Sequence, residues 1–260
     1  MFGQLMQFPE GQIVAFALIL LRMIAFVFAM PLFGTPAVPM PVKISLPLVL
    51  SLLLFPVLIG SATHDFAITE SVIPLAFREV FVGLFLGFFV RLFFFAVSIG
   101  GELIGISSGL ASAQIYNPAM GSQTSILEQF QVMMATLLFL ALSGHHYFIE
   151  GLIKSYEFLP VGELSFNAAA TRNLAMLAQD VIYLGVQLAA PIILSIFLAN
   201  LAMGIIGRAV PQMNVLMTSM QATILVTFAV LIVCIPVTLA SMNSILGRMT
   251  DELMQILRVI

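Results

Sequence analysis

The sequence predicts an all-α, integral-membrane protein with about six apolar helices, some of them broken or kinked. Three observations predict this class. Of the 260 residues, 61% are hydrophobic and only 8% are Asp, Glu, Lys or Arg, whereas a soluble domain carries about 25% charged residues. Apolar runs of about the length of a bilayer span recur along the chain. Prolines and glycines interrupt or flank these runs, which is typical of helices that bend or end there.

Composition also limits the classes of function. The net charge of −3 is spread thinly and no basic block occurs, so nucleic acid is not an expected partner. The single cysteine, Cys234, lies in an apolar run and is expected to be a buried hydrophobic side chain. The first residues lack the positive segment of a signal peptide, so we expect the first apolar run to be retained. No linker divides the chain, and residues 1–260 are predicted to form one membrane unit.

The first two apolar runs are Ile13–Phe33 and Ile44–Gly60. Arg22 lies in the middle of the first run, and a charge at that depth costs several kcal/mol unless it is paired. We therefore expect Arg22 to face protein. Prolines between the runs should end the first helix, and the second run is expected to be kinked or partly unwound because it contains Pro47 and Pro56.

The third apolar run, Val72–Gly100, has about 29 residues and is too long for one straight span. Two interpretations of the charged pair Arg78 and Glu79 remain open. The pair marks a membrane boundary, or it meets charges on other subunits. Gly83 and Gly87 are four residues apart and form a small face on which another helix can pack closely.

The stretch Ile99–Phe130 is the most distinctive part of the chain. It begins with glycines at positions 101, 105 and 109, which are spaced for one helical face. From Gln114 to Ser125 most residues are polar or small, and none is charged. Pro118 disfavours helix at the preceding residue, and Gly121 favours a turn.

Long apolar segments flank this uncharged stretch on both sides. Non-helical backbone at membrane depth is tolerated only where protein buries it or a water-filled cavity wets it. Two interpretations remain open. The stretch is a loop that fills or lines a passage, or it is a plain surface connector between two membrane helices.

Three further apolar runs complete the chain, at Ile126–Ser143, Leu174–Ile206 and Val215–Ile245. The stretch after the first of them is amphiphilic and holds two neighbouring histidines, but their spacing to Glu150 matches no metal motif, so no metal site is predicted. The segment Arg208–Asn214 interrupts the last two runs with polar and helix-breaking residues. The C-terminal tail is charged and amphipathic, which is typical of an interfacial or partner-facing helix.

Lysines and arginines are too few, and too often inside the runs, for the positive-inside rule to fix an orientation. Helices with internal arginines and prolines are expected to be covered by other protein rather than by lipid alone.

The segment GIIGRAVPQMNV (Gly204–Val215) resembles the FliR/SctT family, the export-gate proteins of flagellar biosynthesis and type III secretion. The segments LRMIAFVFAMPLFG, FREVFVGLFLGF and AQIYNPAMGSQ also agree with this family. The likeness covers nearly the whole length, and PQMN is its most specific part. One departure is that the family tends to carry a Gly-Pro-Lys element after PQMNV, where this chain reads LMTSMQATIL.

The resemblance implies an all-α membrane protein whose helical hairpins assemble in a pore complex. One such chain joins several FliP-like and FliQ-like subunits in an export gate for unfolded flagellar proteins, and a FlhB-like subunit associates with it. The chain itself looks like a FliP-like part fused to a FliQ-like part, with a boundary near residues 175–205. The gate belongs to the flagellar basal body in the bacterial inner membrane and largely faces the periplasm. No catalytic residue, cofactor or metal is implied.

The resemblance also implies roles for particular residues, because the central loop of the family is understood to plug the closed pore. The loop corresponds best to Ile106–Ser122. The expected plug residues are Ile106, Gly109, Gln114, Ile115, Tyr116, Asn117, Pro118, Met120 and Gly121. The residues expected at close helix contacts are Gly83, Gly87, Gly101 and Gly105. The residues expected at subunit interfaces are Arg22, Arg78, Glu79, Arg208, Pro211, Gln212 and Asn214.

Two other classes of function account for parts of this sequence. A secondary transporter for a small solute shows broken helices and polar residues at mid-depth, but also matched interruptions in inverted repeats, which this sequence does not show. An intramembrane enzyme needs a catalytic motif, and neither HExxH nor a pair of membrane aspartates occurs. The transporter is the alternative hypothesis, and the protein is not expected to be an enzyme.

Overall fold

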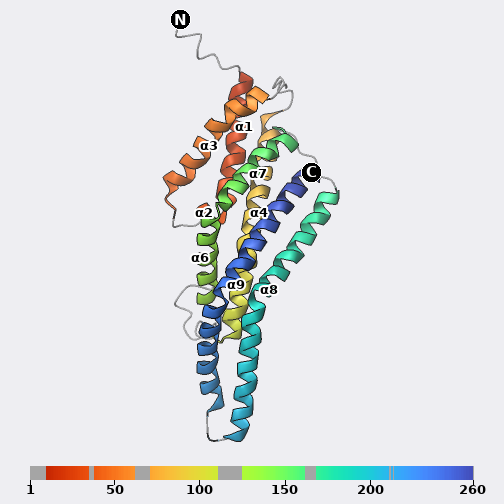
Figure 1. Ribbon diagram of the computed structural model, residues 1–260. Coiled ribbons are helices and arrows are strands. Elements are labelled where there is room, and N and C mark those ends of the chain that lie inside the picture. Colours follow the sequence, from red (N-terminus) through yellow and green to blue (C-terminus); the bar gives the residue numbers. More distant parts are fainter. Residues whose placement is uncertain are drawn as a thin grey trace. The chain divides into compact units, whose positions relative to one another are not determined.

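The computed structural model describes residues 10–34, 38–61, 71–110, 125–161, 168–210, 212 and 214–259. Every regular element in these ranges is a helix, as the sequence predicts (Figure 1). The helices are α1 (Glu10–Ala29), α2 (Pro31–Gly34), α3 (Met40–Ser61), α4 (Val72–Ser107), α6 (Ile126–Ala141), α7 (Gly144–Phe158), α8 (Ala168–Ala209) and α9 (Val215–Val259).

Five helices among the described residues are long and apolar enough to cross a membrane, and a sixth span results if α6 and α7 form one broken span. This confirms the predicted class. The third apolar run is longer than expected, because α4 continues as one helix of 36 residues to Ser107. The second run is not unwound, since α3 passes through both of its prolines. There the hydroxyl of Ser51 donates a hydrogen bond to the carbonyl of Pro47 at 2.7 Å, a side-chain bond of the kind that often bends a helix.

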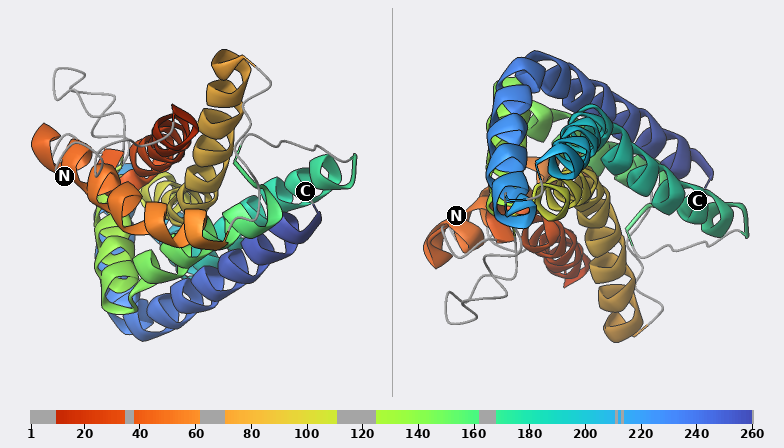
Figure 2. Two further views of the ribbon diagram at one scale, coloured as in Figure 1. Left: turned by 90° about the horizontal axis from the view of Figure 1, so that it is seen from above. Right: turned by 90° about the horizontal axis from the view of Figure 1, so that it is seen from below.

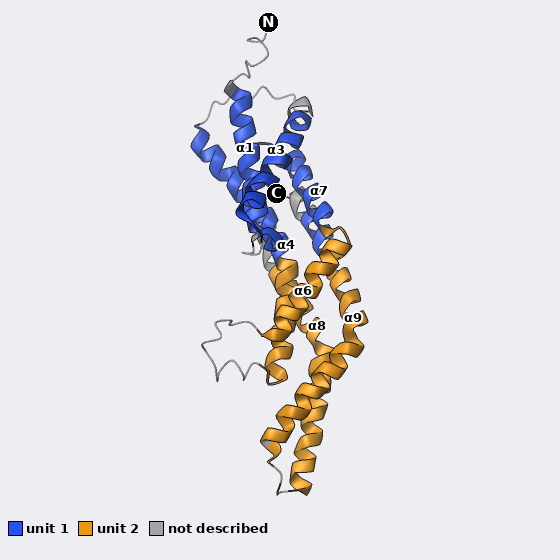
Figure 3. Ribbon diagram, turned by 90° about the vertical axis from the view of Figure 1, so that its left-hand side faces the viewer, with its two compact units in different colours: residues 1–91, 145–174, 249–260 blue, residues 92–144, 175–248 orange. Residues whose placement is uncertain are grey.

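The chain divides into two compact units, which Figure 3 colours separately. Unit 1 comprises residues 1–91, 145–174 and 249–260, and unit 2 comprises residues 92–144 and 175–248. The long helices α4, α8 and α9 each contribute to both units. That the whole chain is one unit with a fusion boundary near residues 175–205 stays a prediction.

In unit 1, α1 and α3 lie side by side (Figure 2). The rings of Phe16 and Phe55 pack edge to face between them, with 5.4 Å between the ring centroids. The buried core of this unit is drawn from α1, the first part of α4, α7 and the end of α9. Its members include Ile19, Met23, Phe26, Leu86, Phe89, Phe148, Leu152, Met249 and Leu253.

In unit 2, an apolar cluster joins α4, α6, α8 and α9. Its buried members are Ile104, Leu127, Ala189, Ile192, Ile196 and Leu231. The helices α8 and α9 run side by side from their junction, as Figure 1 shows. A Cβ on Gly207 near that junction would meet the Val215 side chain at 2.6 Å, so the two helices come close where they meet.

Candidate functional site

The most buried charged group of the described chain is an ion pair in unit 1 between α1 and α4. The Arg22 Nε donates to Glu79 Oε2 at 2.5 Å, and Nη2 donates to Glu79 Oε1 at 3.0 Å. The side chains are 0% and 1% exposed. This is the bidentate geometry that suits a guanidinium and a carboxylate.

Helix α7 and the residue directly after it supply the remaining partners of Arg22. The Nη1 group donates to Ser155 Oγ at 3.1 Å, and Nη2 donates to the backbone carbonyl of Leu159 at 3.2 Å. The guanidinium carbon lies 4.0 Å from the centre of the Tyr156 ring. A buried charge is expensive unless it is paired and hydrogen-bonded, and these contacts meet that requirement. Arg22 therefore links three helices of unit 1.

The placement of Arg22 confirms that it faces protein. It also corrects the expectation that Arg22 and Glu79 meet other subunits, because both side chains are enclosed within the chain and pair with each other. The partners on α7 were missed because the sequence around Ser155 is amphiphilic and was interpreted only as an interfacial stretch. Arg78, next to Glu79, is part-buried and has a partner of its own.

Two glycines of α4 lie directly against α1. A Cβ on Gly83 would meet the Arg22 carbonyl oxygen at 2.4 Å, and a Cβ on Gly87 would meet the Ala29 Cβ at 2.3 Å. Real Cβ atoms do not come this close, so only glycine fits at this helix separation. The carboxylate of Glu79 is one helical turn from Gly83, so this close approach and the ion pair occupy the same face of α4.

In unit 2, α4 comes equally close to α6. A Cβ on Gly101 would meet the Glu128 Cα at 2.5 Å, and a Cβ on Gly105 would meet the Ser125 Oγ. One turn before Gly101, the hydroxyl of Ser98 donates a short hydrogen bond to the Glu128 carboxylate. Gly105 directly precedes the predicted plug loop and Ser125 lies three residues after its end, so the chain comes close to itself on the two sides of that loop.

The predicted face of three glycines is wrong at its last member. The helix ends at Ser107, and Gly109 follows with φ of +81°, a left-handed conformation that glycine adopts without steric cost. Among the other predicted plug residues, Ile106 is 59% exposed on the last turn of α4. The remaining ones lie outside the described residues, and these are Gln114, Ile115, Tyr116, Asn117, Pro118, Met120 and Gly121.

Three of the predicted interface residues lie at the junction of α8 and α9. Arg208 is exposed on the last turn of α8, where a cation suits the negative end of the helix dipole. Gln212 is exposed, and Asn214 is exposed just before α9, where its Oδ1 accepts a hydrogen bond from the Met217 N–H at 3.4 Å. Pro211 lies outside the described residues. An interface role for this group stays a prediction.

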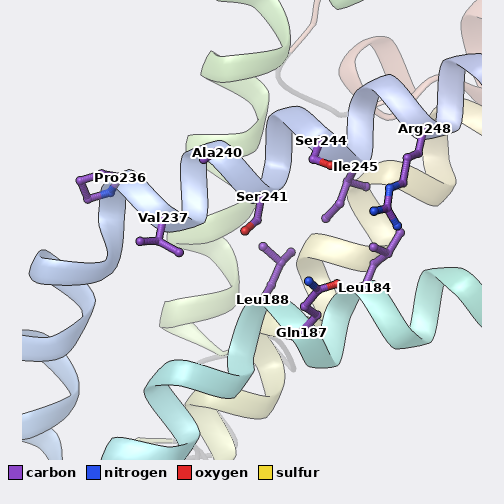
Figure 4. Close-up of a pocket in the computed structure, with 10 residues that line it drawn as sticks. All are labelled: Leu184, Gln187, Leu188, Pro236, Val237, Ala240, Ser241, Ser244, Ile245 and Arg248. Atoms are coloured by element: carbon purple, nitrogen blue, oxygen red, sulfur yellow. The ribbon is translucent and has the colours of Figure 1, made fainter.

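Sequence reasoning missed a groove of about 480 Å³ between α8 and α9 in unit 2. Figure 4 shows α9 changing direction at Pro236, and the groove follows from there along the helix. Apolar side chains line most of it. Its polar lining residues are Gln187, Ser241, Ser244 and Arg248. No group of three or more His, Cys, Asp or Glu side chains that could hold a metal ion occurs among the described residues.

Exposed apolar side chains cover the membrane-length helices on the faces that do not form these cores. On α8, Leu194, Phe197 and Leu201 are 54–60% exposed, and on α9, Leu225 and Val233 are 72% and 76% exposed. Such contiguous apolar surfaces are typical of contact with lipid or with other membrane subunits.

Comparison with known proteins agrees with this architecture. Residues 13–249 match the family model described as bacterial export proteins, family 1. The flagellar biosynthetic protein FliR of Bacillus subtilis is 30% identical over 249 residues, covering 95% of both chains. FliR of Caulobacter vibrioides is 30% identical over 85% of this chain and 88% of its own length. FliR of Escherichia coli is 29% identical over 84% of this chain and 82% of its own length. The chain therefore belongs to family 1 of the bacterial export proteins, the family of the FliR proteins of flagellar biosynthesis.

Proposed function

We propose that this protein is a subunit of the flagellar type III protein export gate in the bacterial inner membrane. It forms a pore for unfolded flagellar proteins together with FliP-like and FliQ-like subunits, and a FlhB-like subunit associates with the assembly. The observation that carries this proposal is the family match over residues 13–249. The exposed apolar faces of the candidate spans support it, because they offer surface for neighbouring subunits.

The central loop, Ile106–Ser122, closes the pore as a plug in this proposal. Support comes from its base, where α4 and α6 meet at Gly105 and Ser125. A plug must also leave the pore readily. The small, uncharged residues of this segment bury little area and offer no charge that would bind a passing substrate.

Assembly is tested by co-expressing the chain with FliP-like and FliQ-like subunits and measuring the native mass of the detergent-extracted complex. We expect the chain to enter one large hetero-oligomer, and deletion of its gene to abolish flagella without changing solute uptake. A chain that purifies only alone, and that transports a small solute in liposomes, would instead support the transporter hypothesis.

The plug role is tested by removing Gln114–Gly121 and measuring ion conductance of the assembled gate. We expect the deletion to make the gate leak. The matched control keeps the same eight residues in scrambled order, which preserves length and bulk and should leave a largely closed gate. Unchanged conductance in the deletion variant, with normal complex yield, would rule out the plug and leave the subunit role standing.

A further inference from the structure

Arg91 is an exposed arginine near the middle of α4. It borders a groove of about 510 Å³ between α1 and α4 in unit 1. The other residues that line the groove are Phe28, Ala29, Phe81, Leu84, Phe85 and Phe88. Unlike Arg22, Arg91 has no carboxylate partner among the described residues. A lone cation at the end of an aromatic and aliphatic groove requires an explanation.

The depth of Arg91 in a membrane follows from its place in the apolar part of α4. The candidate membrane span on this helix is Val72–Ser107, and Arg91 lies near the middle of it. The residues from Val80 to Gly101 contain no other charge. Arginines reach lipid headgroups near the ends of a span, not from its middle, so a lipid phosphate is a poor partner.

The exposed side of α4 has the spacing of a helix-packing surface. Phe77, Phe81, Leu84, Phe88 and Arg91 follow one another at intervals of four and three residues, and we call these five residues the α4 seam. The four apolar members are 41–77% exposed. Alternating intervals of four and three place side chains along one line that a second helix can follow at a shallow crossing angle.

We infer that the α4 seam receives an apolar helix of another gate subunit, and that this helix carries one Asp or Glu in mid-span that pairs with Arg91. The apolar groove accommodates the apolar side chains of that helix, and charge complementarity selects the carboxylate. This inference rests on the proposed function, because it needs other subunits in the assembly. It differs from the Arg22 pair in that the carboxylate comes from outside the chain.

The first experiment replaces Arg91 by leucine in the co-expressed complex and measures the yield of the full complex relative to unassembled chain. Because the partner's carboxylate would lose its counter-charge, we expect the yield to fall roughly tenfold or more. Arg91→Lys, which keeps the charge, should retain most of the yield. Lys154→Leu is the matched control, since Lys154 is an exposed cation of the same unit that pairs only with Glu150, and it should leave the yield unchanged.

The second experiment introduces a photoreactive residue in place of Leu84 in the otherwise wild-type complex. Cross-linking to a different gate subunit is expected, and neutralising an acidic residue in the captured helix should restore the assembly of Arg91→Leu. The cross-linking result tests the inference even if Arg91→Leu fails to fold, because it uses a chain that keeps Arg91.

Three outcomes would overturn the inference: normal assembly of Arg91→Leu, cross-linking to lipid alone, or cross-linking to a second copy of this chain. If the wild-type chain enters no complex with other gate subunits, the proposed function itself fails, and that result is distinct from the other three.

Discussion

The two units stabilise their helix contacts in different ways. In unit 1, the contact between α1 and α4 combines glycines with a buried, bidentate ion pair that also binds α7. In unit 2, the contact between α4 and α6 combines glycines with one hydrogen bond from Ser98, and an apolar cluster joins these two helices to α8 and α9. A buried ion pair is directional and costly to break, whereas apolar packing responds to volume. Unit 1 should therefore be sensitive to charge and unit 2 to size.

The largest expected effect is the loss of the buried pair. Arg22→Ala leaves the Glu79 carboxylate buried without its main partner, and we expect a loss of about 3–5 kcal/mol in the free energy of unfolding. Denaturant unfolding of the purified chain in detergent measures this loss. The double variant Arg22→Met with Glu79→Leu removes both charges and should lose much less. If the double variant is as unstable as the single one, charge is not what fixes this contact.

The expected sensitivity of unit 2 to side-chain size is tested by substitutions at its glycines. Gly101→Ala should lower the free energy of unfolding by about 1–3 kcal/mol, because the new Cβ meets the backbone of α6 and the two helices must separate. Gly204→Ala is the matched control, since nothing lies within 4 Å of its Cβ position, and it should raise stability by up to about 1 kcal/mol through helix propensity. The same unfolding assay measures both. Equal effects of the two substitutions would contradict a close contact at Gly101.

The hydrogen bond between α4 and α6 has a smaller expected effect. Ser98→Ala removes a donor to the part-buried Glu128 carboxylate, and we expect a loss of about 1 kcal/mol. Thr136→Ala is the control, because the hydroxyl of Thr136 bonds only to the Val132 carbonyl on its own helix and should matter less. A larger loss at Thr136 than at Ser98 would mean that this interhelical bond does not stabilise unit 2.

The smallest effect is expected at the exposed pair on α7. Lys154 Nζ lies 2.6 Å from Glu150 Oε1, and both side chains are about half exposed. Exposed pairs at this spacing contribute about 0.3–0.5 kcal/mol. Lys154→Met should therefore change the midpoint of thermal unfolding by about one degree or less. A shift as large as that of Arg22→Ala would show that burial does not separate the two ion pairs.

Much of the fold was predictable, because a lipid bilayer requires each helix that crosses it to be a continuous run of mostly apolar residues. A helix of bilayer length must be apolar along its length, so α1, α3, α8 and α9 are recognisable as apolar runs. The helical glycines at 101 and 105 were predicted from their spacing, but the sequence did not show that they continue the third apolar run as one helix of 36 residues, because an apolar run longer than a bilayer span does not mark where its helix ends.

Of the candidate sites, the need of Arg22 for protein around it was predictable from its depth, but the identity of its partners was not. Glu79 is 57 residues away in sequence and Leu159 is 137 residues away. No periodicity links positions so far apart. The central segment was recognised by composition and family resemblance, and its plug residues beyond Gly109 stay a prediction.

The sequence by itself determined that this chain is helical, that membrane or other membrane protein is its surrounding, and which family it resembles. These follow from hydropathy and short motifs, which are properties of neighbouring residues. Only the tertiary structure decided that Arg22 is neutralised inside the chain while Arg91 is not, and that α4 packs on α1 through one glycine pair and on α6 through another. These pairings depend on which helices, far apart in sequence, pack together. Hydropathy does not decide this, because several helices of this chain are similarly apolar.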